Sequence, residues 1–130
     1  YVTGIFGKEL NEVDPHYVSP GWDRYYTLMD ECEYFGNSFA DDGSPSTVKP
    51  DVYMTTAILN ATTSWILQQR RTAERPFPFF AYVGVHAPHQ PATPDLQYQA
   101  AFQGVRAPRT PAWNLSAPDH HWLVSMQPPL

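Results

Sequence analysis

Residues 79–85 have the sequence FFAYVGV, and residues 86–91 follow at once as HAPHQP. A continuous apolar run of this length predicts a strand that is buried on both faces, as in a parallel sheet. Before it, residues 51–71 repeat a mainly apolar face at helical spacing, formed by Met54, Ile58, Leu59, Thr62, Trp65 and Ile66. Helix, short link, buried strand and polar loop in this order predict an α/β fold.

The rest of the chain divides into shorter predicted elements. Residues 1–6 are rich in β-forming residues and predict a strand. Residues 15–26 contain two prolines and a glycine, which predict a long irregular connection. Residues 34–39 predict a second strand, and residues 41–46 (DDGSPS) predict a turn. We expect a short helix within residues 94–102 and a proline-spaced loop in the remainder.

The composition excludes several classes of protein. A chain of 130 residues is enough for one small domain. Aromatic residues make up 15% of the chain, which argues against a disordered tail. The formal net charge of −5 argues against a nucleic-acid-binding surface, which would be basic. Because no apolar run approaches about 18 residues, we expect no membrane span.

Cys32 is the single cysteine of the chain, so no internal disulfide is encoded. The neighbouring carboxylates keep its thiol protonated, which favours an inert side chain, or one paired with a cysteine outside this stretch, over a nucleophile. The chain opens without an initiator methionine and ends at Leu130 without a capping element. We therefore expect residues 1–130 to be one part of a larger protein.

His86 and His89 are the sharpest chemical feature of the sequence. They follow the predicted strand in a loop that Pro88 and Pro91 stiffen, and ligands of α/β sheets bind at the carboxyl ends of strands. A histidine at such a place can bind an anion or protonate a leaving group near neutral pH. The alternatives are two loop histidines that bond to backbone carbonyls, and a zinc site that would need further ligands. Lys8 also follows a predicted strand, where it is either aimed at an oxyanion or simply solvated.

Three further features have both a functional and a structural interpretation. Asn11, shortly after Lys8, is a candidate for substrate binding or a turn residue. Asn60 and Asn114 begin the triplets NAT and NLS, which are acceptor patterns for N-glycosylation. Trp113 and Trp122 offer aromatic faces on which a sugar ring could pack, although packing between domains explains Trp113 equally well.

Three stretches, in the correct order, resemble the sulfatase family and its glucosamine-6-sulfatase branch, which includes the extracellular heparan endosulfatases. Residues 3–12, TGIFGKELNE, resemble the segment F-x-G-K-Y-L-N-E of that branch. Residues 76–91 contain PFPFF and APHQP, similar to its strand and A-P-H-x-P loop. Residues 98–123 contain YQAAF, APR and HWL, similar to its series Y-Q-x-x-F, A-P-R and K-H-W-L/I. The resemblance covers nearly the whole chain.

The resemblance implies roles for two residues directly. Lys8 matches the family lysine that contacts the sulfate and the formylglycine side chain. His89 matches the active-site histidine that binds the sulfate ester and assists departure of the sugar oxygen. We therefore expect Lys8 and His89 to be the catalytic residues of this part of the chain.

Four more residues are candidates for substrate binding under the same resemblance. Asn11 stands where the branch has an asparagine, while many other sulfatases have a histidine at the position of Leu10. His121 and Trp122 match the HW pair of the branch, which makes them candidates for lining the substrate cleft. His86 has no fixed counterpart in the branch but follows the same strand as His89.

The resemblance also implies an alkaline-phosphatase-like sulfatase fold, of which residues 1–130 would form the central part of a mixed sheet with flanking helices. It implies calcium and a formylglycine nucleophile made within the motif C-x-P-S/A-R. That motif is absent, since Cys32 is followed by Glu33, Tyr34 and Phe35. Asp41 and Asp42 form a tempting ligand pair, but their turn context favours a loop. We expect the calcium ligands outside this stretch, no metal site within it, and no activity from residues 1–130 alone.

The function implied is that of a sulfuric ester hydrolase. Its substrate would be 6-O-sulfate on glucosamine or N-acetylglucosamine residues of sulfated glycosaminoglycans, and its location secreted or lysosomal. Alternatives are a sulfatase-like protein that binds sulfated glycans without cleaving them, and a related arylsulfatase or phosphodiesterase. The expected partners are the sulfated glycan and the rest of the sulfatase chain, with no nucleic acid.

Overall fold

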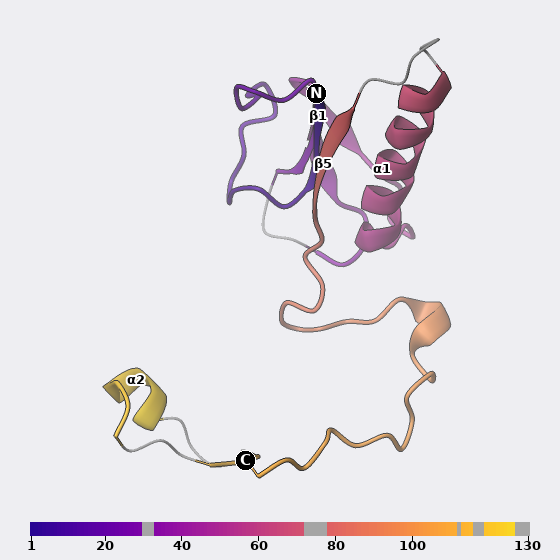
Figure 1. Ribbon diagram of the computed structural model, residues 1–130. Helices are drawn as coiled ribbons and strands as arrows, with labels where there is room; N and C mark the ends of the chain where they lie inside the picture. The colour runs from indigo at the N-terminus through magenta and orange to yellow at the C-terminus, as the bar shows by residue number, and fades with distance from the viewer. Residues whose placement is uncertain (30–32, 72–77, 112, 116–118, 127–130) are drawn as a thin grey trace. The chain divides into compact units, whose positions relative to one another are not determined.

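A five-stranded mixed sheet organises the first part of the chain, in the order β4-β3-β2-β1-β5. The computed structural model describes residues 1–29, 33–71, 78–111, 113–115 and 119–126 (Figure 1). The chain forms two compact units, Tyr1–Asp95 and Leu96–Leu130. The strands of the first unit are β1 (Val2–Gly7), β2 (Arg24–Leu28), β3 (Ser38–Asp41), β4 (Ser44–Thr47) and β5 (Phe79–Gly84).

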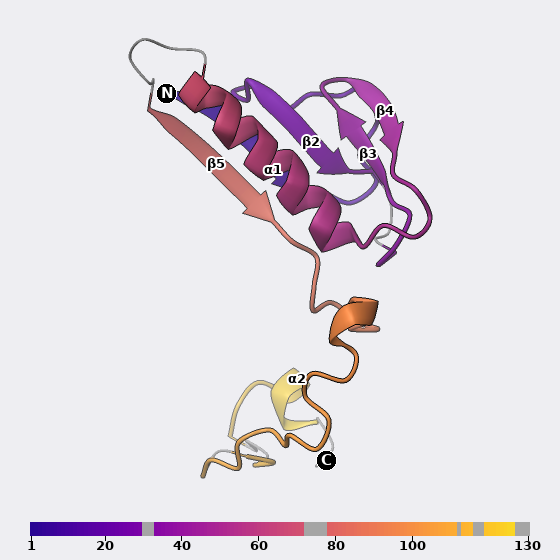
Figure 2. The same ribbon diagram turned by 90° about the vertical axis from the view of Figure 1, so that its right-hand side faces the viewer.

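Strand β1 pairs in parallel with both of its neighbours, β2 and β5. Strands β2, β3 and β4 follow one another as an antiparallel meander. Helix α1 (Met54–Arg71) lies between β4 and β5 in the chain and packs along one face of the sheet (Figures 1 and 2). This arrangement confirms the predicted α/β class.

The core is divided between the two faces of the sheet, because neighbouring residues of a strand point to opposite faces. Under α1, Phe6 of β1 contacts Trp65 with ring centroids 5.5 Å apart. The other buried side chains on this face are Tyr26, Leu28, Tyr34, Phe39, Met54, Ala57 and Ile58. The opposite face has a smaller cluster formed by Ile5, Val13, Tyr25 and Ala40.

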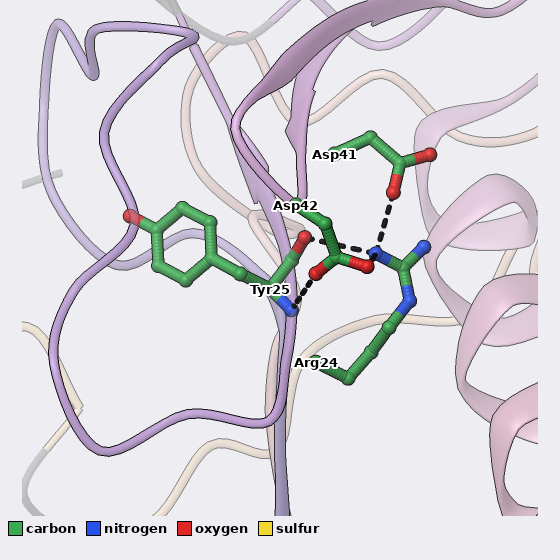
Figure 3. A network of polar contacts seen from close by, with 4 residues as sticks. All are labelled: Arg24, Tyr25, Asp41 and Asp42. Carbon is green, nitrogen blue, oxygen red and sulfur yellow. Dashed lines mark hydrogen bonds and ion pairs between the residues drawn. The ribbon is translucent and has the colours of Figure 1, made fainter.

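An ion-pair network ties β2 to the β3–β4 turn. The Arg24 guanidinium lies 2.5 Å from a carboxylate oxygen of Asp41 and 2.7 Å from one of Asp42 (Figure 3). The second oxygen of Asp42 accepts from the backbone N–H of Tyr25 at 2.7 Å. Both aspartates are therefore engaged in fixing the sheet. The turn itself is Asp42–Gly43, with both residues at positive φ, as a tight two-residue hairpin requires.

Four predicted elements need correction. The expected irregular connection of residues 15–26 contains the start of β2, and the expected turn of residues 41–46 contains most of β4. In both places a strand forms despite nearby proline or glycine residues. Pairing with neighbouring strands outweighs the local preference of these residues for turns. The strand expected at residues 34–39 is β3, which begins only at Ser38, while Phe35 forms an isolated bridge with Tyr53. The helix begins at Met54, three residues later than expected.

The burial predicted for two apolar segments is also wrong. Strand β5 exists as predicted, but Phe80 is 53% exposed and Tyr82 47% exposed. Within the described residues β5 is an edge strand that pairs with β1 alone, which explains this exposure. Leu59, expected on the apolar face of α1, is 48% exposed, whereas Ile58, Thr62 and Trp65 are buried as predicted.

The second unit has little regular structure in its described residues. A 3₁₀ turn, η1, covers Leu96–Tyr98 within the segment where a short helix was expected. A four-residue helix, α2, covers Trp122–Ser125. The Arg109 guanidinium stacks over the Trp113 ring at 3.7 Å from its centroid. In the described parts of both units, no helix is long and apolar enough to cross a bilayer.

Candidate functional site

The candidate site begins where two parallel strands end side by side. In the register of β1 and β5, Gly7 is paired with Gly84. The backbone N–H of Lys8 continues this pairing by donating to the Gly84 carbonyl at 2.7 Å. The segments that follow the two strands therefore leave the sheet at the same edge, which is where α/β sheets bind ligands.

Two glycines allow this close approach of the strand ends. Gly7 has a φ of 95°, a backbone conformation that residues with a side chain rarely adopt, and a Cβ there would overlap the Gly84 carbonyl. A Cβ at Gly84 would lie 2.5 Å from the Lys8 carbonyl oxygen. The close contact of Lys8 with the end of β5 thus depends on two positions without side chains.

A pocket of about 340 Å³ opens at this edge. It brings together four of the predicted site residues, Lys8, Asn11, His86 and His89, and its remaining lining residues are Glu12, Glu33, Gln90 and Pro91. Lys8 and Asn11 follow β1, and the two histidines follow β5. Residues almost eighty positions apart in the sequence therefore share one pocket.

The two histidines form a stacked pair. Their ring centroids are 4.2 Å apart with an interplanar angle of 27°. The backbone N–H of His89 donates to the His86 carbonyl at 3.0 Å, which closes a turn between them. The peptide bonds Ala87–Pro88 and Gln90–Pro91, on either side of His89, are both cis.

The tautomer of His89 follows from its hydrogen bond. Its Nδ1 lies 2.8 Å from the carbonyl oxygen of Gln90. Because a carbonyl oxygen only accepts, Nδ1 must carry a proton, and Nε2 is left as the nitrogen that takes up or releases one. This is the arrangement that a general acid or base needs.

Partial burial lowers the pKa of His86, and repulsion from His89 and Lys8 lowers it further. At neutral pH His86 is therefore mainly uncharged. Its ring edge packs on Tyr34, with centroids 5.9 Å apart. An anion bound between His86 and Lys8 would oppose both repulsions and favour the charged imidazolium.

The segment after β1 is anchored on the other side of the sheet by Glu9. One carboxylate oxygen of Glu9 accepts from the Tyr25 hydroxyl at 2.6 Å and from the Ser19 hydroxyl at 3.2 Å. Tyr25 belongs to β2, so the residue next to Lys8 is tied to a neighbouring strand. Sequence reasoning missed Glu9, although its place directly after Lys8 was a signal.

Sequence reasoning also missed two carboxylates in the pocket. Glu12 and Glu33 line it together with Lys8 and the histidines. Glu12 has a φ of 54°, an uncommon conformation for a residue with a side chain. Its position next to Asn11 in the quoted motif could have indicated it, whereas nothing in the sequence pointed to Glu33. Both can accept hydrogen bonds from hydroxyl or amino groups of a ligand.

The remaining predicted site residues stay predictions. His121 and Trp122 belong to the unit of residues 96–130, where His121 Nδ1 accepts from the Leu123 N–H at 3.3 Å. Asn60 lies mid-helix on an exposed position of α1, and Asn114 is exposed as well. Ser116, the third residue of the second glycosylation triplet, and Cys32 lie outside the described residues.

Calcium is the metal that the sulfatase resemblance implies. Among them, no group of three or more histidine, cysteine, aspartate or glutamate side chains gathers in a way that could hold a metal ion. Asp41 and Asp42, the tempting pair, bind Arg24 instead. The pocket is thus mainly a set of cationic and polar donors with two carboxylates.

Comparison with known proteins gives consistent matches, although no protein-family model matches the chain. Human N-acetylglucosamine-6-sulfatase is 31% identical over 133 residues, which cover 95% of this chain and 23% of that protein. A putative extracellular sulfatase Sulf-1 homolog of Caenorhabditis elegans is 27% identical over 95% of this chain and 18% of its own length. An extracellular sulfatase SULF-1 homolog of Drosophila melanogaster is 27% identical over the whole chain and 12% of its own length. These similarities over nearly the whole chain support a sulfatase-family sequence, and the chain spans less than a quarter of the length of these relatives.

Proposed function

We propose that the protein containing this sequence is a sulfuric ester hydrolase that removes 6-O-sulfate from glucosamine or N-acetylglucosamine residues of sulfated glycans. One observation carries the proposal: Lys8, Asn11, His86 and His89 line one pocket at the carboxyl ends of β1 and β5. The relatives include proteins named N-acetylglucosamine-6-sulfatase, which supports the choice of substrate. An alkaline-phosphatase-like fold for the whole protein and a secreted or lysosomal location belong to the same proposal.

The pocket suits a sulfate ester because its donors come from both strand ends. The Lys8 ammonium presents three donors as a compact positive charge, and the Asn11 amide adds neutral donors. Fixed donors aimed at sulfate oxygens stabilise the charge on the group without reorganisation during the reaction. The segments that carry them are held by backbone pairing and by Glu9, so little ordering is left for the moment of binding.

His89 supplies the proton in this proposal. When the bond between sulfur and the sugar oxygen breaks, that oxygen gains negative charge and needs a proton. His89 Nε2 delivers it, while the bond from Nδ1 to Gln90 holds the ring in the required tautomer. His86, stacked beside it, gains positive charge as the anion binds and adds a donor to the sulfate.

Glu12 and Glu33 favour a sugar over a plain sulfate ion. Their carboxylates accept hydrogen bonds from sugar hydroxyls or an amino group next to the sulfate. They also repel a second anionic group at the same place, because like charges are costly when brought together. The pocket is thus suited to a sugar that bears its sulfate at one position within reach of Lys8.

In this proposal, residues outside the pocket supply the nucleophile and hold the calcium that the sulfatase resemblance implies. The motif C-x-P-S/A-R is absent from the sequence, and the described residues do not form a metal-binding cluster. The part of the chemistry assigned to this pocket is therefore sulfate binding and proton delivery.

The test uses the full-length protein and a panel of sulfated sugars. We expect sulfate release, measured by ion chromatography, from N-acetylglucosamine 6-sulfate and from oligosaccharides that contain it. The matched 3-sulfated sugar should react at least about tenfold more slowly, because its sulfate and its hydroxyls cannot reach their partners together. Binding of the sugars without any sulfate release would contradict the proposal and favour a glycan-binding protein. Cleavage of a phosphodiester instead would favour the related phosphodiesterases.

A further inference from the structure

Two tyrosine hydroxyls hold the histidine loop, residues 86–93, from outside it. The Tyr34 hydroxyl donates to the backbone carbonyl of His89. The Tyr53 hydroxyl donates to the backbone carbonyl of Thr93 at 3.0 Å. Tyr34 is only 4% exposed, and its hydrogen bond to His89 is partly buried. Such bonds are stronger than those at the surface and costly to lose.

The two tyrosines are themselves fixed to the start of α1. Their rings stack with centroids 5.9 Å apart. The backbone carbonyl of Tyr34 accepts from the N–H of Met54, the first residue of α1, at 2.9 Å. Phe35 bridges Tyr53 through the backbone and packs against its ring at 5.3 Å. The pair thus joins the buried core under α1 to the loop that carries the histidines.

The histidine loop has features that require such support. Ala92 has a φ of 57°, which costs free energy for a residue with a side chain and persists only where its surroundings hold it. Its N–H donates to the same His89 carbonyl that Tyr34 binds, at 2.7 Å. The carbonyl of His89 is therefore held from two directions, and the edge of the His86 ring rests on Tyr34 as well.

We propose that Tyr34 and Tyr53 are positioning residues that hold the histidine loop in the geometry needed for proton delivery by His89. This inference rests on the proposed sulfatase function and extends it to two residues outside the pocket lining. Burial raises the pKa of Tyr53, and the nearby Tyr34 raises it further, so its hydroxyl stays protonated and can donate at neutral pH. Lys8 is held separately, through Gly84 and Glu9, so loss of the tyrosine hydroxyls leaves sulfate binding largely intact.

The experiment compares Tyr34→Phe, Tyr53→Phe and the double variant with wild type in the full-length protein. Each substitution removes one hydroxyl and keeps the ring that packs in the core. Tyr26→Phe is the matched control, because Tyr26 is buried on the same face of the sheet and stacks on Phe39 at 4.2 Å. The readouts are kcat and KM on a 6-sulfated sugar, the melting temperature, and hydrogen–deuterium exchange of the peptide covering residues 86–93.

We expect kcat to fall about three- to tenfold in each single variant and further in the double variant, with KM within about twofold of wild type. Exchange of the loop peptide should become faster in these variants and remain unchanged in Tyr26→Phe. Unchanged kcat, or a fall in melting temperature without any change in kcat, would overturn the inference. A wild-type protein that releases no sulfate refutes the proposed function instead. In that case hydrogen–deuterium exchange alone tests whether Tyr34 and Tyr53 hold the histidine loop. Unchanged exchange of the loop peptide in the double variant would overturn the inference.

Discussion

At the scale of single residues, the chemistry of the pocket depends on which nitrogen of each histidine carries a proton. His89 is settled by geometry, because its Nδ1 donates to the Gln90 carbonyl and its Nε2 remains for the ligand. The protonation of His86 depends on burial and on neighbouring charge, because burial, His89 and Lys8 all lower its pKa. The two stacked rings therefore differ in environment even though they follow the same strand. The sequence resemblance separated the two residues, with His89 as a catalytic candidate and His86 as a candidate for substrate binding. It could not give the tautomer of His89 or the lowered pKa of His86, which depend on Gln90, on burial and on Lys8.

The lowered pKa of His86 predicts a specific response to sulfate. A bound anion supplies negative charge next to the imidazole, which raises the pKa of His86 from its lowered value. By linkage, sulfate must bind more tightly as the pH falls through the range in which His86 titrates. The measurement is an NMR titration of histidine ring resonances with and without sodium sulfate.

His16 is the internal control for this titration. It lies on another loop, where its Nδ1 contacts the Gly43 carbonyl at 3.1 Å, and it does not line the pocket. We expect its ring resonances not to respond to sulfate. A pKa of His86 that stays constant or falls in saturating sulfate would contradict an anion site at this position.

At the scale of elements, the site depends on the parallel pairing of β1 and β5 at their carboxyl ends. Gly7 is paired with Gly84 there, and the Lys8 N–H donates to the Gly84 carbonyl at 2.7 Å. The strands were predictable from their composition, but their adjacency was not. Nothing in the residues of β1 specifies that β5, more than seventy positions later, pairs with it in parallel. The exposed side chains of β5 show the same limit, because burial depends on which elements pack against the strand, and the hydrophobicity of the strand does not specify them.

Substitution of Gly7 by alanine should therefore damage both the fold and the site. Gly7 has a φ of 95° and a carbonyl in the space that a Cβ would occupy, whereas Gly21 has the same φ and no atom within 4 Å of a Cβ. Gly21→Ala is thus the matched control for backbone strain alone, which costs about 1–3 kcal/mol. We expect Gly7→Ala to lower the free energy of unfolding by clearly more than Gly21→Ala, as measured by urea denaturation. Equal losses in the two variants would show that the strands are not in close contact at Gly7.

At the scale of the whole molecule, the proposed function assigns one half of a reaction to the described chain. It gathers donors for an anion and a proton carrier at the edge of a mixed sheet, and the described residues do not add a metal-binding cluster. The sulfatase resemblance was recoverable from the order of the motifs, and the relatives confirm it. Glu12 could have been recognised from its place beside Asn11 in the quoted motif. Glu33, Tyr34 and Tyr53 were not recoverable as site residues, because their contacts with the histidine loop or the pocket join segments that are far apart in the sequence. His121 and Trp122 remain predictions that belong to the second unit.

The central claim is that the pocket at the ends of β1 and β5 binds the sulfate ester and that His89 donates the proton when the ester is cleaved. The most direct test is His89→Ala in the full-length protein, with His16→Ala as a control for loss of a loop histidine. Because the His89 side chain is exposed, folding should be retained. We expect kcat for a 6-sulfated sugar to fall by about 100-fold or more in His89→Ala and to stay within about twofold of wild type in His16→Ala. Unchanged turnover in a folded His89→Ala variant would remove His89 from the reaction and contradict the account.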